Sequence, residues 1–269
     1  MMTGPRSQSG REGALAILTA WEVGTHTAAE LLESFLPQSE SPGQVTDLVC
    51  GVLRNRTLLD TLLVRTAQVK IRHIEPDLLT LLRLGSYELL FCPDTAAYAV
   101  LSETVSLTGK NKKRRGFANA VLRSVQRAIE DRRAVEGADP RRWIPGKTEA
   151  SGCLLKEPLL PDPQTDPSGH FSTVFSIPEW LIDTWLAAWG PQTAGHICLG
   201  SNRVPSIILQ PNTLKTDAVK LAEILKSEAV AADLNEARTM LRIHTHRYLA
   251  DLWAFANGYF LVQDPSAAK

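Results

Sequence analysis

Apolar residues recur every three to four positions through the first half of the chain, which is the spacing of amphipathic helices. Short polar connections separate these segments, so the pattern predicts an all-α domain of about six or seven helices. The segment 75–91 carries leucines on almost every side and is predicted to be the central, most buried helix. The predicted helices cover residues 10–23, 28–36, 42–56 with a continuation over 58–63, 75–91, 96–108 and 116–133.

The pattern changes in the second half of the chain. Residues 136–175 contain six prolines and few periodic apolar positions, which predicts a linker or an extended segment that wraps around a domain. From residue 176 to 269, short strand patterns alternate with helical ones, so a small α+β segment is expected there. Ser176 and Thr216 are candidate N-terminal caps for two of its helices. The predicted strands cover 206–210, 239–244 and 259–262, and the predicted helices cover 177–190, 193–199, 217–227 and 249–255.

The expected fold class is therefore mainly α. A helical bundle over residues 10–135 is followed by the linker and then by a small α+β segment of ferredoxin-like or RRM-like character over 176–269.

A dense group of cations stands at the start of the last bundle helix. Gly116 is predicted to open this helix, with Phe117, Val121 and Leu122 on its inner face and Arg123 on its outer face. Positive charge at a helix N-terminus opposes the macrodipole, and a bound phosphate would relieve that conflict. A lysine-rich loop that serves only solubility is the alternative. The cations are Lys110, Lys112, Lys113, Arg114 and Arg115.

Other basic residues lie near the ends or turns of predicted helices. They are predicted to converge with the cations at 110–115 on one face, where they would contact phosphates without reading a nucleotide sequence. These residues are Arg11, Arg54, Arg56 and Arg83.

The composition limits the kinds of site that the chain can hold. The formal net charge is +0, so a nucleic-acid site would have to be a local patch. Neither a dinucleotide-binding glycine pattern nor a P-loop is present. The four cysteines lack zinc spacing, and the histidines at 244 and 246 have no evident third ligand, so no metal is expected. Without a secretory leader or a membrane-spanning apolar run, the protein is expected in the cytoplasm.

Several segments resemble a known family. GVLRNRTLLDTLL (51–63), LLRLGSYELLF (81–91), LSETV (101–105) and RGFANAVLRSV (115–125) are similar to the all-α RNA-binding domain of the NusB type. FSIPEWLIDTWLAAWG (175–190), LQPNTLKT (209–216) and NGYFLVQDPSA (257–267) resemble the region that follows this domain in Sun/RsmB-type ribosomal RNA cytosine-C5 methyltransferases.

The resemblance implies that 16S-type ribosomal RNA is the partner and that the helical domain can also bind a protein. In the family, the last matching segment leads into an S-adenosylmethionine-binding domain with two catalytic cysteines. The expectation is therefore an RNA-binding part truncated before that domain, without a catalytic residue, cofactor or metal site, and inactive alone. An antitermination-type adaptor without enzymatic role is the alternative. The expected RNA contacts are Arg11, Arg54, Arg56, Lys110, Lys112, Lys113, Arg114, Arg115 and Arg123.

Overall fold

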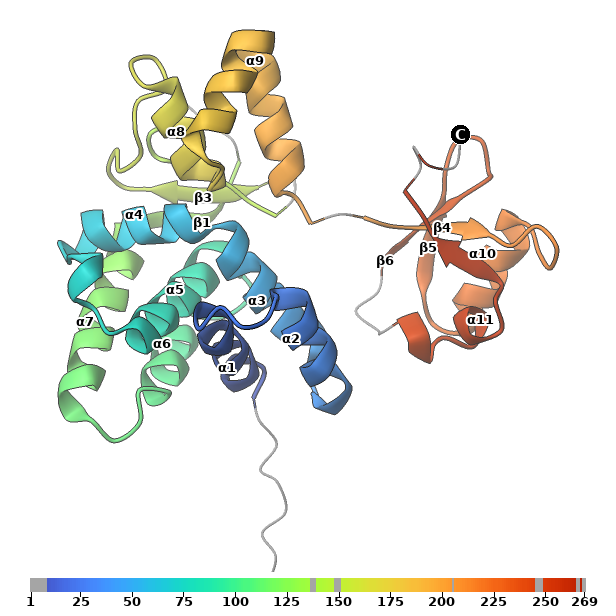
Figure 1. Ribbon diagram of the computed structural model, residues 1–269, viewed down its shortest axis with the longest axis horizontal. Coiled ribbons are helices and arrows are strands. Elements are labelled where there is room, and N and C mark those ends of the chain that lie inside the picture. The colour runs from blue at the N-terminus through green and yellow to red at the C-terminus, as the bar shows by residue number, and fades with distance from the viewer. Residues whose placement is uncertain are drawn as a thin grey trace, which may run out of the picture. The chain divides into compact units, whose positions relative to one another are not determined.

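The computed structural model describes residues 9–135, 139–147, 151–204, 206–244, 249–264 and 267. It divides into two compact units, Met1–Arg203 and Val204–Lys269, which are described separately (Figure 1). No helix among the described residues is both long enough and apolar enough to cross a membrane.

The first unit begins with a bundle of seven helices within its described residues. The helix α5 lies at its centre, and every residue from 78 to 91 is buried, as the sequence predicts. Gly51 lets the helix at Pro42–Arg54 approach α5 closely, because a Cβ atom at Gly51 would fall 2.0 Å from the Tyr87 ring of α5. The helices are α1 (Gly10–Glu22), α2 (Ala28–Phe35), α3 (Pro42–Arg54), α4 (Arg56–Ala67), α5 (Pro76–Phe91), α6 (Ala97–Ser106) and α7 (Lys112–Ala128), with short 3₁₀ turns at Leu36–Gln38 and Ile71–His73.

Both ends of α7 differ from the prediction. The helix begins at Lys112, four residues before Gly116, because the Asn111 side chain accepts hydrogen bonds from the N–H groups of Lys113 and Arg114. Four of the five cations therefore lie in its first turn, where the free N–H groups are already partly satisfied, and Lys110 lies before the helix. The helix ends at Ala128, and the predicted continuation to 133 is instead the strand β1 (Ile129–Ala134).

The inner face of α7 is formed by Ala118, Val121, Leu122 and Val125, whereas Phe117 is 37% exposed. The predicted burial of Phe117 is therefore wrong. Phe117→Ala should lower the free energy of unfolding by about 1–2 kcal/mol, because the ring is only partly covered and less buried apolar surface is lost than at an inner position. Leu122→Ala should lower it by about 2–5 kcal/mol, because Leu122 is fully buried. Urea unfolding of both variants tests this, and equal losses would contradict the assigned face.

A small antiparallel sheet and two helices complete the first unit. The strands β1, β2 (Trp143–Pro145) and β3 (Gly152–Leu155) pair in the order β1-β3-β2. The helices α8 (Pro167–Phe175) and α9 (Glu179–Asn202) pack on each other, and α8 also contacts α4. Figure 1 shows β1 and β3 between the bundle and the α8–α9 pair. The expected linker over 136–175 thus contains two strands and a helix of the first unit.

One hydrophobic core joins these added elements to the bundle. Ile144, Cys153, Phe175 and Ile182 belong to the same buried cluster as Leu58 and other bundle residues. Their short segments contain few apolar residues, and burial against the bundle supplies the stability that they lack alone.

Ser176 caps a different helix from the predicted one. It adopts a left-handed conformation (φ 54°) at the end of α8, and Pro178 precedes α9 instead. The Ser176 hydroxyl accepts hydrogen bonds from the N–H groups of Thr57 and Leu58, at 3.0 and 3.2 Å. It therefore caps the N-terminus of α4, which lies 118 residues away in the sequence. Gly190 (φ 73°) interrupts α9, close to the predicted end of the first of two helices.

Arg132 of β1 closes the C-terminal end of α5. Its guanidinium donates hydrogen bonds of 2.6–2.8 Å to the carbonyl oxygens of Glu88, Leu89, Cys92 and Thr95. Carbonyl groups at a helix C-terminus lack intrahelical donors, so the Arg132 guanidinium can satisfy them. Its positive charge also interacts favourably with the negative end of the helix macrodipole.

The second unit contains the predicted small α+β structure, but it begins at Val204 rather than at residue 176, because α9 packs on α8 within the first unit. Its described strands form one antiparallel sheet in the order β5-β6-β4-β7, and Leu209, Leu221 and Leu241 lie in its core. Asp217, not Thr216, caps α10 through the N–H of Lys220. The side chain of His244 and all of His246 lie outside the described residues. The elements are β4 (Ile207–Pro211), α10 (Ala218–Ser227), β5 (Ala231–Leu234), β6 (Leu241–His244), a 3₁₀ turn at Leu249–Asp251, α11 (Trp253–Ala256) and β7 (Phe260–Val262).

Candidate nucleic-acid interface

A polar groove of about 510 Å³ runs between α6 and α7. Arg115, Asn119 and Arg123 lie four residues apart on α7 and therefore share one side of that helix. The opposite wall comes from α6 and includes Tyr98 and Ser102. We call this site the α6–α7 groove. Its remaining lining residues are Leu101, Val105, Gly116 and Gln126.

The groove combines cations with an accessible aromatic ring. Tyr98 is 77% exposed, so its ring face is open for stacking. Arg123 Nε donates a hydrogen bond of 3.1 Å to Asn119 Oδ1, which orients its guanidinium. Gly116 leaves open space, since no heavy atom lies within 4 Å of the position of a Cβ atom. Such a surface has the donors and the ring needed for a single-stranded nucleic acid.

Most of the predicted basic run is exposed beside the groove. Lys110, Lys112, Lys113 and Arg115 are all exposed at the start of α7. Lys112, Lys113 and Arg115 lie on the first turn of α7, and Lys110 lies two residues before it, so their charges act together on a polyanion.

Arg114 has a structural partner instead. It pairs with Asp77 and, at 3.4 Å, with Glu75, so it ties α7 to the start of α5. Its hydrogen bond holds the pKa of Asp77 below the ordinary value. The charge of Arg114 is thus largely compensated within the protein.

Arg11 lies in the core rather than on the proposed surface. Its side chain is 9% exposed, and Nε is 2.6 Å from Glu88 Oε2, with a second ion pair to Glu103. Burial raises the pKa of Glu88, because desolvation disfavours its charged form more than Arg11 stabilises it. A direct RNA contact by Arg11 is inconsistent with this arrangement.

The remaining cations do not converge on the α6–α7 groove. Arg56 pairs with Glu22 and lies 5.3 Å over the Trp21 ring, and Arg54 is half-buried nearby. Both stand at the α3–α4 junction, which Figure 1 shows at the other end of the bundle from the α6–α7 connection. Arg83 is buried and pairs with Asp60 and Glu22. The predicted convergence of all the cations is therefore wrong.

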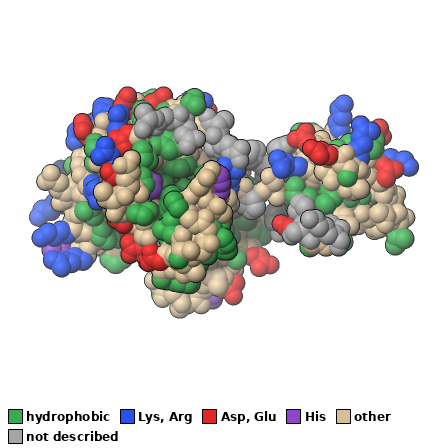
Figure 2. Space-filling model, turned by 90° about the horizontal axis from the view of Figure 1, so that it is seen from above, with side chains coloured by type: hydrophobic (Ala, Val, Ile, Leu, Met, Phe, Trp, Pro, Cys, Tyr) green, Lys and Arg blue, Asp and Glu red, His purple; other side chains and the backbone are tan. Residues whose placement is uncertain are grey.

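Figure 2 shows charged side chains of both signs on the visible face of the first unit. This agrees with the zero net charge of the sequence. The described residues contain no group of three or more His, Cys, Asp and Glu side chains that could hold a metal ion.

Comparison with known proteins identifies both halves of the chain. Residues 8–127 match the NusB family, and residues 177–249 match the RsmF/B-like methyltransferase ferredoxin-like domain. A probable ribosomal RNA small subunit methyltransferase B of Bacillus subtilis (strain 168) is 29% identical over 97% of this chain and 54% of its own length. The transcription antitermination protein NusB of Geobacter sulfurreducens is 31% identical over 46% of this chain and 95% of its own length.

A solved structure extends the comparison of the fold. The crystal structure of PH0851 has a TM-score of 0.55 at 15% identity, covering 99% of this chain and 55% of that one. The chain thus spans about half the length of these first relatives. It belongs to the NusB family through residues 8–127 and carries, over residues 177–249, the ferredoxin-like domain of RsmF/B-like methyltransferases.

Proposed function

We propose that this chain is the RNA-binding part of an S-adenosylmethionine-dependent ribosomal RNA (cytosine-C5) methyltransferase of the cytoplasm. In this role it holds 16S-type ribosomal RNA for base methylation. The observation that carries the proposal is the α6–α7 groove, where two arginines and an exposed tyrosine adjoin the exposed lysines of α7. The names of relatives such as the Bacillus subtilis protein support ribosomal RNA as the substrate class.

The groove suits a single strand of RNA. Arg115 and Arg123 are eight residues apart on α7, so they stand about 12 Å apart along its axis and can contact different phosphates. A base stacks on Tyr98, and the amides of Asn119 and Gln126 offer hydrogen bonds to base edges. Lys110, Lys112 and Lys113 add attraction that does not depend on sequence. No catalytic or cofactor-binding residue is proposed in this chain.

Binding of a labelled single-stranded RNA to the full chain tests the charge contribution. The triple variant K112A/K113A/R115A should bind at least about 10-fold more weakly at low salt, and its log–log salt slope should be smaller by about 2, since each phosphate contact contributes about 0.7. The control K220A/K226A/R238A removes the same charge from exposed positions of the second unit. Unchanged binding by the first variant, or equal weakening by both, would remove the α6–α7 groove as the site.

The same titration examines Tyr98 separately from charge. Base–aromatic stacking contributes about 1–3 kcal/mol, so Tyr98→Ala should weaken RNA binding by about 10-fold or more. Tyr98→Phe keeps the ring and should bind like the parent chain. Equal affinity of the alanine variant and the parent would show that no base stacks there.

A protein-binding adaptor is the second candidate function. A groove of about 670 Å³ between α1 and α6 is lined mainly by apolar side chains, including Leu15, Leu107 and Val23, which is 72% exposed. Such a surface suits an apolar partner. Binding through it would change little between low and high salt, whereas RNA binding through phosphate contacts would weaken steeply.

A further inference from the structure

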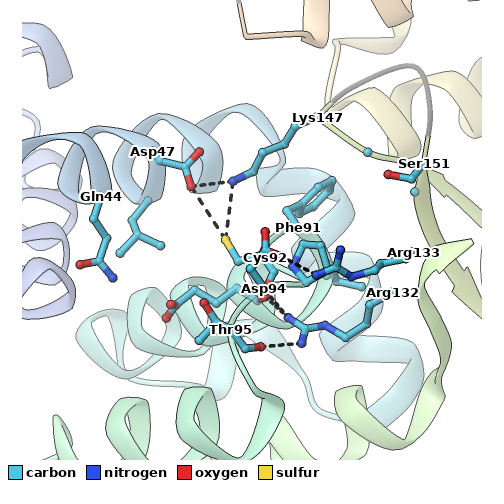
Figure 3. A pocket seen from close by; sticks show the side chains of 16 residues that line it. Gln44, Asp47, Phe91, Cys92, Asp94, Thr95, Arg132, Arg133, Lys147 and Ser151 are labelled. Carbon is cyan, nitrogen blue, oxygen red and sulfur yellow. Dashed lines mark hydrogen bonds and ion pairs between the residues drawn. The ribbon is translucent and has the colours of Figure 1, made fainter. Parts of the chain in front are cut away.

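A second pocket of the first unit brings a thiol, an amine and a carboxylate together. Its volume is about 490 Å³, and it shares no lining residue with the α6–α7 groove. Asp47 comes from α3, Cys92 directly follows α5, and Lys147 follows β2. Figure 3 shows the three side chains pointing toward one another. We call them the Asp47–Cys92–Lys147 cluster.

The contacts hold the lysine nitrogen against the sulfur. Lys147 Nζ lies 2.6 Å from Asp47 Oδ2 and 3.6 Å from Cys92 Sγ. Cys92 Sγ lies 3.8 Å from the same carboxylate oxygen. Lys147 Nζ is also 5.1 Å above the centre of the Tyr87 ring, which itself donates a hydrogen bond to Asp47. The nitrogen is therefore fixed by two groups other than the thiol.

The surroundings of Cys92 differ from those of the other cysteines. Cys153 and Cys198 are buried, and Cys50 is half-buried. Among the hydrogen bonds of the described residues, Cys92 is the cysteine whose sulfur contacts a lysine amine. Cys92 also lines an open pocket, so a small oxidant can reach its sulfur.

We propose that hydrogen peroxide converts Cys92 and Lys147 into a covalent N–O–S cross-link, reversible by thiols. One peroxide molecule oxidises the thiol to a sulfenic acid and is reduced to water. A second accepts two electrons from the amine as the N–O bond forms, which releases two further water molecules. In total, the thiol and the amine each lose one hydrogen, one N–H remains, and two peroxide molecules yield the N–O–S linkage and three water molecules. Asp47 accepts the proton by which the lysine ammonium becomes the reactive amine.

The cross-link would join the end of α5 covalently to the residues that follow β2. Cys92 stands at the end of α5, and Lys147 stands between β2 and β3, 55 residues later. Burial raises the pKa of the Cys92 thiol to about 11, so the sulfur stays protonated at neutral pH. Because the thiolate is the form that attacks peroxide, oxidation of Cys92 should be slow at neutral pH and should accelerate as pH rises toward that value.

Mass spectrometry of the full chain after peroxide treatment tests the proposal. The expected product is about 14 Da heavier than the reduced chain, from a gain of oxygen and a loss of two hydrogens. Peptide mapping should find Cys92 and Lys147 in one linked species that dithiothreitol separates. Oxygen additions on Cys92 without the linked species, or a disulfide in its place, would overturn the proposal.

Two variants serve as matched controls. Lys147→Arg keeps a cation beside Asp47 but has no primary amine, and Cys92→Ser removes the sulfur while leaving the other cysteines in place. Neither should give the linked species, although Cys92 of the first variant should still gain oxygen. Thermal melting establishes that both are folded. The same mass shift in either folded variant would show that the bond forms elsewhere.

Discussion

Arg132→Ala is expected to lower the free energy of unfolding by about 3–4 kcal/mol. Four carbonyl oxygens around the C-terminal end of α5 would lose a charged donor at once, and hydrogen bonds to charged groups contribute about 1.5–3 kcal/mol each, without full additivity. Water can replace part of this loss because the pocket shown in Figure 3 is open. Urea unfolding followed by circular dichroism measures the change, since the helices of the first unit dominate the signal.

Arg133 provides a neighbouring control. Its side chain is 62% exposed and pairs with Asp94, which is 91% exposed, so Arg133→Ala should cost less than about 1 kcal/mol. Arg132→Lys keeps the charge but cannot reach all four oxygens, and an intermediate loss is expected. Equal stability of the two alanine variants would show that Arg132 does not support the end of α5.

Arg11→Met is expected to destabilise the protein by about 3–5 kcal/mol at neutral pH. Glu88 is 1% exposed, so the substitution would leave its carboxylate buried without a partner. An uncompensated buried charge strongly lowers the free energy of unfolding. The sign of the pH dependence follows from the raised pKa of Glu88. Because the folded state binds this proton more readily than the unfolded state, its contribution to stability falls as pH rises from the ordinary value near 4.5 through the raised one.

The loss in Arg11→Met should therefore shrink as pH falls through the raised pKa of Glu88, because the buried carboxyl becomes neutral there. Arg11→Met/Glu88→Leu removes both buried charges and should recover most of the stability at neutral pH. Arg56→Met is the control, since the exposed fractions of Arg56 and Glu22 are 38% and 27% and their pair should contribute less than about 1 kcal/mol. Urea unfolding at several pH values measures these free energies. A small loss of stability in Arg11→Met at every pH would contradict the predicted cost of leaving Glu88 unpaired.

The bundle helices could be predicted from sequence because their signals are local. Leucines on all sides indicated the central position of α5, and the 3.6-residue period placed the other helices within a few residues of their ends. The strand β1 shows the limit of this approach. Ile129 follows Val125 at helical spacing, yet Ile129 pairs with Leu155 in β3, a partner that no local pattern reveals.

The candidate site was predictable only in part. The exposed lysines of α7 were visible as a run, and Arg115 and Arg123 share one helix face by spacing. Tyr98 was missed, although its place outside the apolar stripe of α6 was an available signal. Arg11 was assigned to the wrong group of residues because its partner Glu88 is 77 residues away. Pairing of charges depends on tertiary contacts, so a list of basic residues does not separate surface cations from core cations.

The contact between Ser176 and α4 bears on cooperativity. The residue that caps α4 belongs to the α8–α9 connection, and the buried cluster around Leu58 includes Phe175 and Ile182. Melting of α8 and α9 would leave the first N–H groups of α4 unbonded and expose one side of that cluster. The bundle and its later additions therefore form one cooperative folding unit. A protein cut at residue 127, the end of the NusB-family match, would retain the bundle helices. It would lose Ser176, which caps the N-terminus of α4.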